Sequence, residues 1–181
     1  MIVDIGTGDG RAVLDRARAE PWAFVIGLDA NASAMAEASN RAFRERVANA
    51  LLLVEAAEAL PGPLAETAHL VTINFPWGSL LRGVLGMDDA VLRGIAGLVA
   101  REGSIEVLAS VAPGDRVVGI DVLDRSATGR IATAWAALGF EFVAMRPATD
   151  LDLREARSSW ARRLGNRPAW LLTIRRCGHA D

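Results

Sequence analysis

The 181-residue sequence has few of the residues that form disulfides or bind metals. It contains one cysteine, Cys177, and two histidines, His69 and His179. A single cysteine has no partner for an intrachain disulfide, which agrees with a reducing cytoplasm. With two histidines and one cysteine, a zinc site has too few of its usual ligands, so we expect no metal centre.

Lysine and long apolar runs are also missing. All 20 basic residues are arginine, which suits bidentate phosphate contacts, although codon bias explains the absence of lysine just as well. No apolar run reaches the roughly 18 residues that a transmembrane helix needs. No secretory leader is recognisable either, so we expect a cytoplasmic protein without a membrane partner.

The length and composition are those of an ordinary globular protein. Hydrophobic residues make up 51% and charged residues 23% of the chain, and we expect one domain over residues 1–181. The net charge of −2 is unevenly distributed. Residues 1–150 carry 13 basic and 19 acidic side chains (net −6), whereas residues 151–181 carry 7 and 3 (net +4), so the basic excess is C-terminal.

Short apolar runs alternate with helical patterns along the chain. The pattern predicts strands over residues 1–5, 23–29, 51–56, 69–75, 104–111, 140–146 and 169–175, and helices over residues 11–20, 32–49, 88–101, 127–138 and 150–164. Near-continuous apolar strands separated by helices predict an α/β fold with a parallel sheet covered on both faces. The least regular segment, residues 112–126, is either a loop near a ligand or a surface connection.

A glycine-rich loop, DIGTGDGR, joins the first strand to the first helix. Gly6, Gly8 and Gly10 let the backbone approach a ligand and adopt torsions that side chains oppose. A dinucleotide fingerprint requires G-x-G-x-x-G, but here the third glycine comes one residue early. Asp4 also ends the strand, where a carboxylate repels a pyrophosphate and attracts the ammonium group of S-adenosylmethionine (SAM). The loop therefore favours SAM over NAD.

Acidic residues follow the next two predicted strands. Asp29 comes 19 residues after Gly10, where a carboxylate can accept both ribose hydroxyls of an adenosine; the alternative is a helix-capping turn. In EAAEALP, Ala57 can contact adenine through its backbone and Glu58 through its carboxylate, unless Glu58 is simply a solvated charge. Loop and acids together indicate a Rossmann-like SAM-dependent methyltransferase.

The stretch NFPWGSLL follows the fourth predicted strand, where a methyl acceptor would bind. Pro76 stiffens this turn and offers no competing N–H group. Trp77 can then present a flat face to a purine. The motif resembles the polar-Pro-aromatic motif of amino-methyltransferases, with one residue too many.

A second tryptophan, Trp160, lies in the basic C-terminal part. Two indoles could hold a flipped base between them, because base stacking contributes about 1–3 kcal/mol per partner. Alternatively Trp160 is a core residue, since it shares a helical stripe with Leu153 and Leu164. We expect Trp22, Trp135 and Trp170 to be packing residues.

Four motifs, DIGTGDGR, AAEALP, FPWGSLL and SSWARRL, occur in this order over nearly the whole chain. The sequence thereby resembles the aminoglycoside-resistance methyltransferases, of the kanamycin and apramycin type, that modify adenine N1 in the decoding site of bacterial 16S rRNA. The resemblance implies a class I SAM-dependent methyltransferase fold with seven strands, mostly parallel, the last one antiparallel. It also implies 16S rRNA within the 30S subunit as partner, and a monomer that requires no protein partner.

The resemblance assigns roles to individual residues. It implies that Trp77 and Trp160 grip the flipped adenine, that Ser158 helps to position it, and that Arg163 and Arg167 contact the RNA backbone. The SAM-binding set is Asp4, Gly6, Thr7, Gly8, Gly10, Asp29, Ala57, Glu58, Asn74, Phe75, Pro76 and Ser79.

The sequence departs from the family in two respects. The resemblance implies an N-terminal hairpin extension, whereas this sequence starts inside its first predicted strand at Met1. It also implies a basic protein, whereas this chain is net acidic. Both departures bear on ribosome docking, because phosphate contacts dominate nucleic-acid affinity. Two other functions stay open: SAM-dependent methylation of tRNA or a small molecule, and SAM binding without transferase activity.

Overall fold

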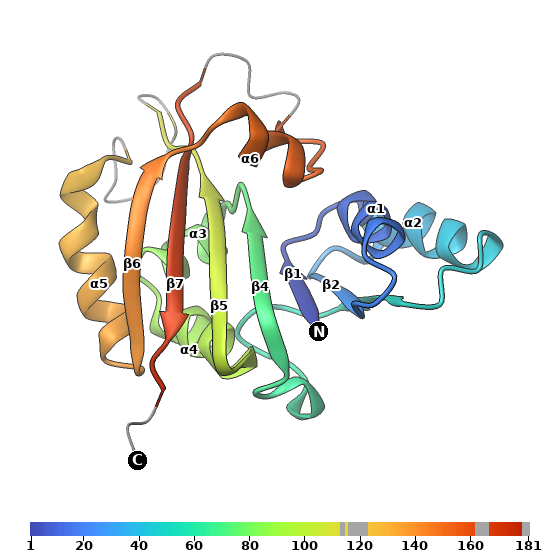
Figure 1. Ribbon diagram of the computed structural model, residues 1–181, viewed down its shortest axis with the longest axis horizontal. Helices are drawn as coiled ribbons and strands as arrows, with labels where there is room; N and C mark the ends of the chain where they lie inside the picture. Colours follow the sequence, from blue (N-terminus) through green and yellow to red (C-terminus); the bar gives the residue numbers. More distant parts are fainter. Residues whose placement is uncertain (113–114, 116–122, 162–166, 179–181) are drawn as a thin grey trace.

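The computed structural model describes residues 1–112, 115, 123–161 and 167–178. Its centre is one seven-stranded sheet in the order β3-β2-β1-β4-β5-β7-β6 (Figure 1). The strands are β1 (Ile2–Ile5), β2 (Val25–Asp29), β3 (Ala50–Val54), β4 (Ala68–Asn74), β5 (Val99–Ala109), β6 (Phe140–Pro147) and β7 (Trp170–Arg176). Strands β1 to β5 pair in parallel, and only β7 runs antiparallel to its neighbours β5 and β6. The predicted α/β class and the antiparallel last strand are confirmed.

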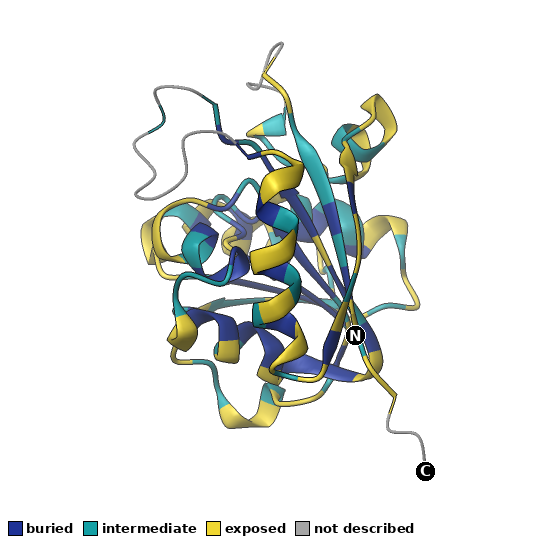
Figure 2. Ribbon diagram, turned by 90° about the vertical axis from the view of Figure 1, so that its left-hand side faces the viewer, coloured by how far each residue is buried: buried dark blue, intermediate teal, exposed yellow. Residues whose placement is uncertain are grey.

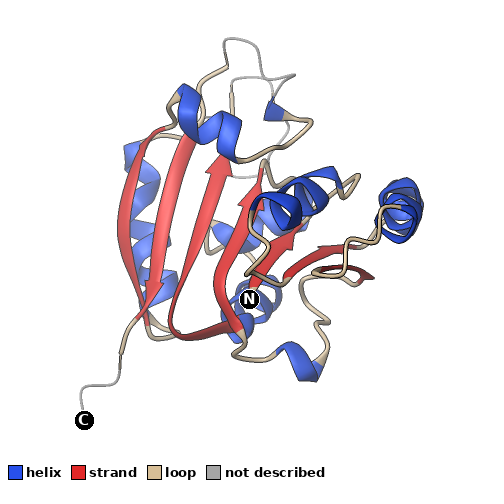
Figure 3. Ribbon diagram, turned by 45° about the vertical axis from the view of Figure 1, so that its right-hand side comes forward, coloured by secondary structure: helices blue, strands red, loops and turns tan. Residues whose placement is uncertain are grey.

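Among the described residues, six α-helices connect the strands, and Figure 3 shows helices and strands in different colours. The helices are α1 (Arg11–Ala19), α2 (Ala32–Arg44), α3 (Gly78–Val84), α4 (Asp89–Leu98), α5 (Thr128–Ala136) and α6 (Asp150–Glu155), with short 3₁₀ turns at Gly62–Leu64 and Arg125–Ala127. Side-chain caps set several of their starts. Asn31 caps α2, Asp88 caps α4, and Thr149 forms a capping box with Asp152 at α6.

The two faces of the sheet carry different helices. On one face, alternate residues of β1 and β2 such as Ile2 and Val25 pack with Val13 and Ala17 of α1. On the other face lies the larger core, in which Val3, Ile5, Ile26 and Leu28 share a cluster with buried residues of α3, α4 and α5. Figure 2 shows the buried residues gathered along the strands and beneath the helices.

The predicted helices lie on both faces of the sheet, but on one face they leave part of the antiparallel half exposed. On β5, Ile105 and Val107 are buried but Glu106 is exposed, and Glu106 pairs with Thr173 of β7. Among the described residues only α6 lies over this face of β5 and β7 (Figure 1). Parallel strands are usually buried on both faces, whereas antiparallel strands tolerate water on one face, and the polar side chains follow that division.

The helix predictions for residues 88–101 and 150–164 need correction, and one helix was missed. The predicted helix over residues 88–101 ends at Leu98, because Val99 already belongs to β5 and Gly103 packs closely against the Ala68 carbonyl instead of capping a helix. The helix predicted to run to residue 164 ends at Glu155, and residues 162–166 lie outside the described residues. Helix α3, in WGSLLRGV, was not predicted. Most of the segment 112–126 also lies outside the described residues.

Candidate functional site

The glycine loop between β1 and α1 has the backbone shape that its sequence predicts. Gly6, Gly8 and Gly10 have φ angles of 72°, 60° and 69°, in the left-handed region that side chains oppose. A Cβ atom on Gly6 would lie 2.7 Å from Leu80, and one on Gly10 would lie 2.9 Å from Ala38, whereas one on Gly8 would meet nothing within 4 Å. Close packing therefore leaves no room for a side chain at Gly6 or Gly10, whereas Gly8 faces open space.

Asp29 ends β2 and holds the glycine loop. Its Oδ2 accepts a hydrogen bond from the Gly8 amide at 2.7 Å, and its Oδ1 accepts one from the Asn31 amide at 2.8 Å. Asp29 thus takes part in a capping turn before α2, and it also fixes the loop that precedes α1. Each carboxylate oxygen has a second lone pair, so the side chain can still accept ribose hydroxyls.

Asp4 is a buried carboxylate in the middle of the site. Its Oδ1 accepts hydrogen bonds from Thr72 Oγ1 at 2.7 Å and from Asn74 Nδ2 at 3.1 Å. Burial raises the pKa of Asp4 above its usual value, against the lowering effect of the hydrogen bond from Thr72. A carboxylate held in this way is available for a cationic group that enters the site.

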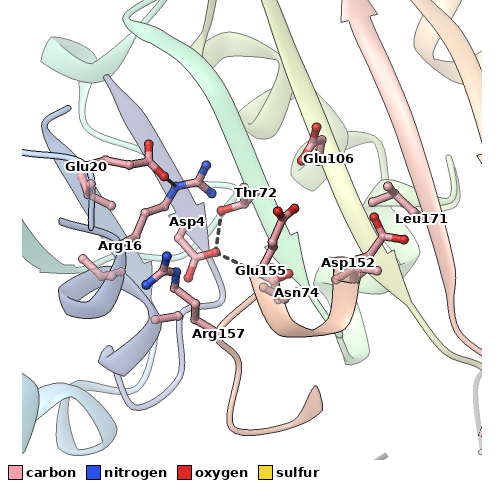
Figure 4. A pocket seen from close by; sticks show the side chains of 15 residues that line it. Asp4, Arg16, Glu20, Thr72, Asn74, Glu106, Asp152, Glu155, Arg157 and Leu171 are labelled. Carbon is pink, nitrogen blue, oxygen red and sulfur yellow. Dashed lines mark hydrogen bonds and ion pairs between the residues drawn. The ribbon is translucent and has the colours of Figure 1, made fainter. Parts of the chain in front are cut away.

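Two hollows meet at Asp4. The larger, about 280 Å³, runs from α1 across β4 and β5 to β7 beneath α6 (Figure 4). The smaller, about 40 Å³, lies over the glycine loop. Asp4, Ala12 and Asn74 line both. The smaller hollow is lined in addition by Gly6, Thr7, Gly8, Asp9, Ser158, Ser159 and Trp160.

The turn after β4 places Trp77 at the carboxyl edge of the sheet. Phe75 has a φ of 53°, and its amide donates to the Leu108 carbonyl at 2.7 Å, so the turn is tied to β5. Pro76 is buried, and Trp77 precedes α3 with 59% of its surface exposed. Ser79 is exposed in the first turn of α3.

The segment after α6 brings Trp160 to the cofactor side of the molecule. Ser158 accepts a hydrogen bond from the Trp160 amide at 3.2 Å, which forms a tight turn. Trp160 is 59% exposed, so the alternative of a core tryptophan is wrong. The reason is that the chain leaves the helix at Arg157, and the apolar stripe of a continuous helix does not form.

The remaining predicted residues are placed as follows. Ala57 is buried and Glu58 exposed in the turn after β3, whose Glu55 amide donates to the Asp29 carbonyl at 3.1 Å. Arg167, predicted to contact the RNA backbone, forms an ion pair with Asp115 in this structure. Arg163 lies outside the described residues.

The other three tryptophans differ from one another. Trp135 is fully buried, donates from Nε1 to the Val84 carbonyl at 3.0 Å and packs edge-on against Phe140, which confirms its packing role. Trp170 is partly buried against the main core. Trp22 is 83% exposed in the turn after α1, so the packing prediction was wrong for it.

Two residues with clear roles were not among the predictions. Thr72 donates to Asp4, which its place as a polar residue inside an apolar strand could have indicated. Arg157 bridges to α1 from a position that no local pattern marks. Within the described residues, no group of three or more His, Cys, Asp or Glu side chains could hold a metal ion, and no helix is long and apolar enough to cross a membrane.

The site fits SAM on three observations. The space in front of Gly8 is open, so a ligand can approach the backbone there. The Thr7 hydroxyl is buried close to Asp4 but makes no hydrogen bond of good geometry to the described residues, a state that proteins usually avoid unless a ligand or water completes it. The Asp4 carboxylate lies beside the same hollow and can attract an ammonium group.

Sheet order and site together define a class. The strand order reverses between β1 and β4, and in open α/β sheets ligands bind at that point, at the carboxyl ends of the strands. With the acidic glycine loop, this is the architecture of a Rossmann-like SAM-dependent methyltransferase. The model of the family described as "NpmA: 16S rRNA (adenine(1408)-N(1))-methyltransferase" matches residues 1–174, and the chain belongs to this family.

Individual relatives agree with that assignment. The chain is 34% identical to a 16S rRNA (adenine(1408)-N(1))-methyltransferase from Streptoalloteichus tenebrarius, over 91% of this chain and 80% of that relative. A crystal structure of such an enzyme from Catenulisporales acidiphilia, a tryptophan-to-alanine variant with its cosubstrate SAM, is similar with a TM-score of 0.85 and 29% identity, covering 99% of this chain and 87% of the other. The 16S rRNA methyltransferase KamB matches with a TM-score of 0.84 and 29% identity, over 97% and 87% of the two chains.

Proposed function

We propose that the protein transfers the methyl group of SAM to N1 of adenine 1408 of 16S rRNA in the 30S subunit. The observation that carries the proposal is the position of Trp160, which is exposed and lines the same hollow as Asp4 and the glycine loop. An exposed indole beside a cofactor site is a stacking surface for a base. The relatives are named as methyltransferases of adenine 1408 at N1, and the proposed target base and atom are taken from those names.

The chain's own residues bind, orient and shelter the reactants. Gly8 and Asp29 would hold the adenosine part of SAM, with Ala57 and Glu58 at its adenine, and Asp4 would face its ammonium group. When bound, SAM supplies an activated methyl group on a sulfonium. Trp77 and Trp160 would hold the flipped adenine, and Ser158 would keep the Trp160 turn in place.

This reaction needs no general base. N1 of neutral adenine carries a lone pair and no proton, so its attack on the methyl carbon would break the carbon–sulfur bond, release a neutral thioether and leave the positive charge on the methylated adenine. Catalysis then depends on alignment and on keeping water away from the reacting pair, and oriented reactants gain several orders of magnitude in rate. The site accordingly relies on stacking and positioning groups.

Methylation at this position would confer aminoglycoside resistance. The chain is 35% identical to the aminoglycoside resistance methyltransferase NpmB1, with a TM-score of 0.78. We propose that the protein acts in the cytoplasm as a monomer without a protein partner. Expression in a sensitive bacterium should raise the inhibitory concentrations of kanamycin and apramycin.

The deciding experiment is methylation of purified 30S subunits. Radiolabelled SAM should give incorporation into 30S subunits but not 50S subunits, and primer extension should stop next to adenine 1408, because a methyl group on N1 blocks base pairing. Incorporation into tRNA instead would show that tRNA, and not 16S rRNA, is the substrate. SAM binding by calorimetry with no incorporation into any RNA would mean that the protein binds SAM without being a transferase.

A further inference from the structure

The segment that carries Trp160 has little apolar attachment to the rest of the molecule. Helix α6 has six residues, and none of its side chains is buried. Beneath it lies the hollow of about 280 Å³, and beside it a second hollow of about 490 Å³. Helices are normally held by apolar packing, so other contacts must fix the position of α6 and the residues after it.

At the start of α6, polar contacts fix the position of the helix. Arg146 of β6 forms an ion pair with Asp152, and Asp152 also accepts a hydrogen bond from the Thr149 amide at 2.6 Å. These contacts hold the first turn of the helix to β6. They do not reach the end of the helix, where the chain turns toward Trp160.

Arg157 makes the contact at that end. Its Nη1 donates to the Asp15 carbonyl oxygen of α1 at 3.0 Å, across 142 positions of sequence. Figure 4 shows the side chain reaching from the α6 segment toward α1. Arg157 is the arginine that lines both of these hollows, so it lies where the two spaces border on each other.

The backbone at Arg157 directs the chain into the site. Its φ of 51° is in the left-handed region, and its amide donates to the Arg154 carbonyl at 3.2 Å, which ends the helix. Ser158, Ser159 and Trp160 follow directly and line the hollow over the glycine loop. Helix α1 begins at Arg11, immediately after that loop. The contact to Asp15 therefore joins the Trp160 segment to the helix that extends the cofactor loop.

We propose that Arg157 is a positioning residue that holds Trp160 at a fixed place relative to the glycine loop by anchoring the end of α6 to α1. The inference rests on the proposed function for its consequence in catalysis, but the anchor itself is independent of it. Because the acceptor is a backbone carbonyl, the anchor requires a donor at position 157 and does not require the Asp15 side chain. An exposed arginine can instead serve as a phosphate contact, which the experiment below separates.

The chain offers matched variants. Arg157→Gly removes the guanidinium while glycine adopts a positive φ without steric strain, so this variant should fold at least as well as the wild type. Arg157→Lys keeps a charge and a donor. Arg154→Ala removes an equal charge from an exposed arginine that lines the second hollow three residues earlier, and it leaves the anchor intact.

Hydrogen exchange measures the anchor without any need for activity. In the absence of RNA, Arg157→Gly should exchange faster over residues 150–161, while Arg157→Lys and Arg154→Ala stay close to wild type. In methylation of 30S subunits, misplaced stacking should lower kcat of Arg157→Gly by roughly 10- to 100-fold. Its KM for 30S subunits and its SAM affinity should stay near wild type, and Arg157→Lys should recover most of the loss.

Two results would overturn the anchor. One is exchange and kcat in Arg157→Gly equal to those in Arg154→Ala. The other is a raised KM with a weaker salt dependence and an unchanged kcat, which would identify Arg157 as a phosphate contact. If the wild-type protein methylates no 30S subunits, the proposed function fails, and the exchange data still decide whether the anchor exists.

Discussion

At the scale of single residues, Asp4 is the residue whose proposed role in SAM binding comes at a cost in stability. It is buried and its pKa is raised by burial, so ionisation is less favourable in the folded chain than in the unfolded one. A group of this kind contributes stability fully below its unfolded pKa and loses that contribution as pH rises through its folded pKa. Above this raised pKa, the ionised and buried carboxylate therefore lowers the stability of the SAM-free protein.

Replacing Asp4 by Asn should separate the two effects. The amide oxygen can still accept hydrogen bonds from Thr72 and Asn74, but the buried charge is gone. We expect a higher melting temperature for the SAM-free protein and a SAM affinity lower by roughly tenfold, equivalent to about 1.4 kcal/mol. Calorimetry and thermal unfolding measure both. Asp9→Asn, in the same loop but partly exposed, is the control, and a lower melting temperature for Asp4→Asn would contradict the burial argument.

The two exposed indoles carry the second residue-scale prediction. Trp77→Ala and Trp160→Ala should each lower methylation of 30S subunits by roughly 10- to 100-fold, because a stacking partner contributes about 1–3 kcal/mol. SAM affinity should stay within about threefold of wild type in both variants, since neither indole belongs to the proposed SAM-binding set; about threefold is well under 1 kcal/mol.

Trp22→Ala is the matched control for these variants, because Trp22 is also exposed but lies in the turn after α1. It should methylate like the wild type. Loss of SAM binding together with methylation in Trp77→Ala would show that this indole supports the turn, and would remove it from the proposed grip on the base.

Residues with local partners were predictable from sequence, and residues with distant partners were not. The glycine loop could be predicted because three glycines at alternate positions directly after a strand indicate a turn with positive φ angles. Thr72 and Arg157 were missed because their partners lie 68 and 142 positions away. Trp160 was open to two interpretations, and only the left-handed turn at Arg157 decides between them.

At the scale of elements, α4 packs against the turn that follows β3. A Cβ atom on Gly94 would lie 1.8 Å from the carbonyl oxygen of Ala57, in the turn proposed to hold adenine. A backbone atom cannot move aside as a flexible side chain can. The close passage of α4 therefore fixes this turn, which connects a helix on one face of the sheet to the cofactor edge.

Gly94→Ala should accordingly displace the Ala57–Glu58 turn and weaken SAM binding by about tenfold or more, with a loss of stability of roughly 1–3 kcal/mol from overpacking. Gly97→Ala is a control on the same helix, because its Cβ would meet nothing within 4 Å. It should be stabilising by up to about 1 kcal/mol, since alanine favours helix over glycine. Equal effects of the two substitutions would contradict a specific contact at Ala57.

Element types were predicted more securely than element ends. Seven strands and five of the six α-helices follow from periodicity, because buried faces impose it on the sequence. The ends of α4 and α6 depend on tertiary contacts: β5 pairing begins at Val99, and the chain turns at Arg157. Helix α3 was missed because Trp77 and Gly78 obscure the spacing of its buried Leu81 and Val84.

At the scale of the whole molecule, the sheet divides into two halves with different surroundings. The parallel half, β3-β2-β1-β4, lies between helices on both faces and carries the cofactor site. The antiparallel half exposes polar residues on one face, with Ser104 opposite Arg175 and Glu106 opposite Thr173. Most of the proposed SAM-binding residues lie in the first half, so we expect the cofactor to stabilise the chain through β1, β2 and their loops.

This gives a test of the cofactor class that uses the intact protein. A ligand at about 100 times its Kd stabilises the folded state by about 2.7 kcal/mol, and each kcal/mol raises the melting temperature of a chain of this size by about 2–4 °C. SAM should therefore raise the melting temperature by roughly 5–10 °C at that concentration. NAD should give no shift, because Asp4 would repel its pyrophosphate and the third glycine comes one residue early. Asp29→Ala should lose the shift with SAM, since both the ribose acceptor and the support of Gly8 are removed; an equal shift with NAD would show that the glycine loop does not select the cofactor.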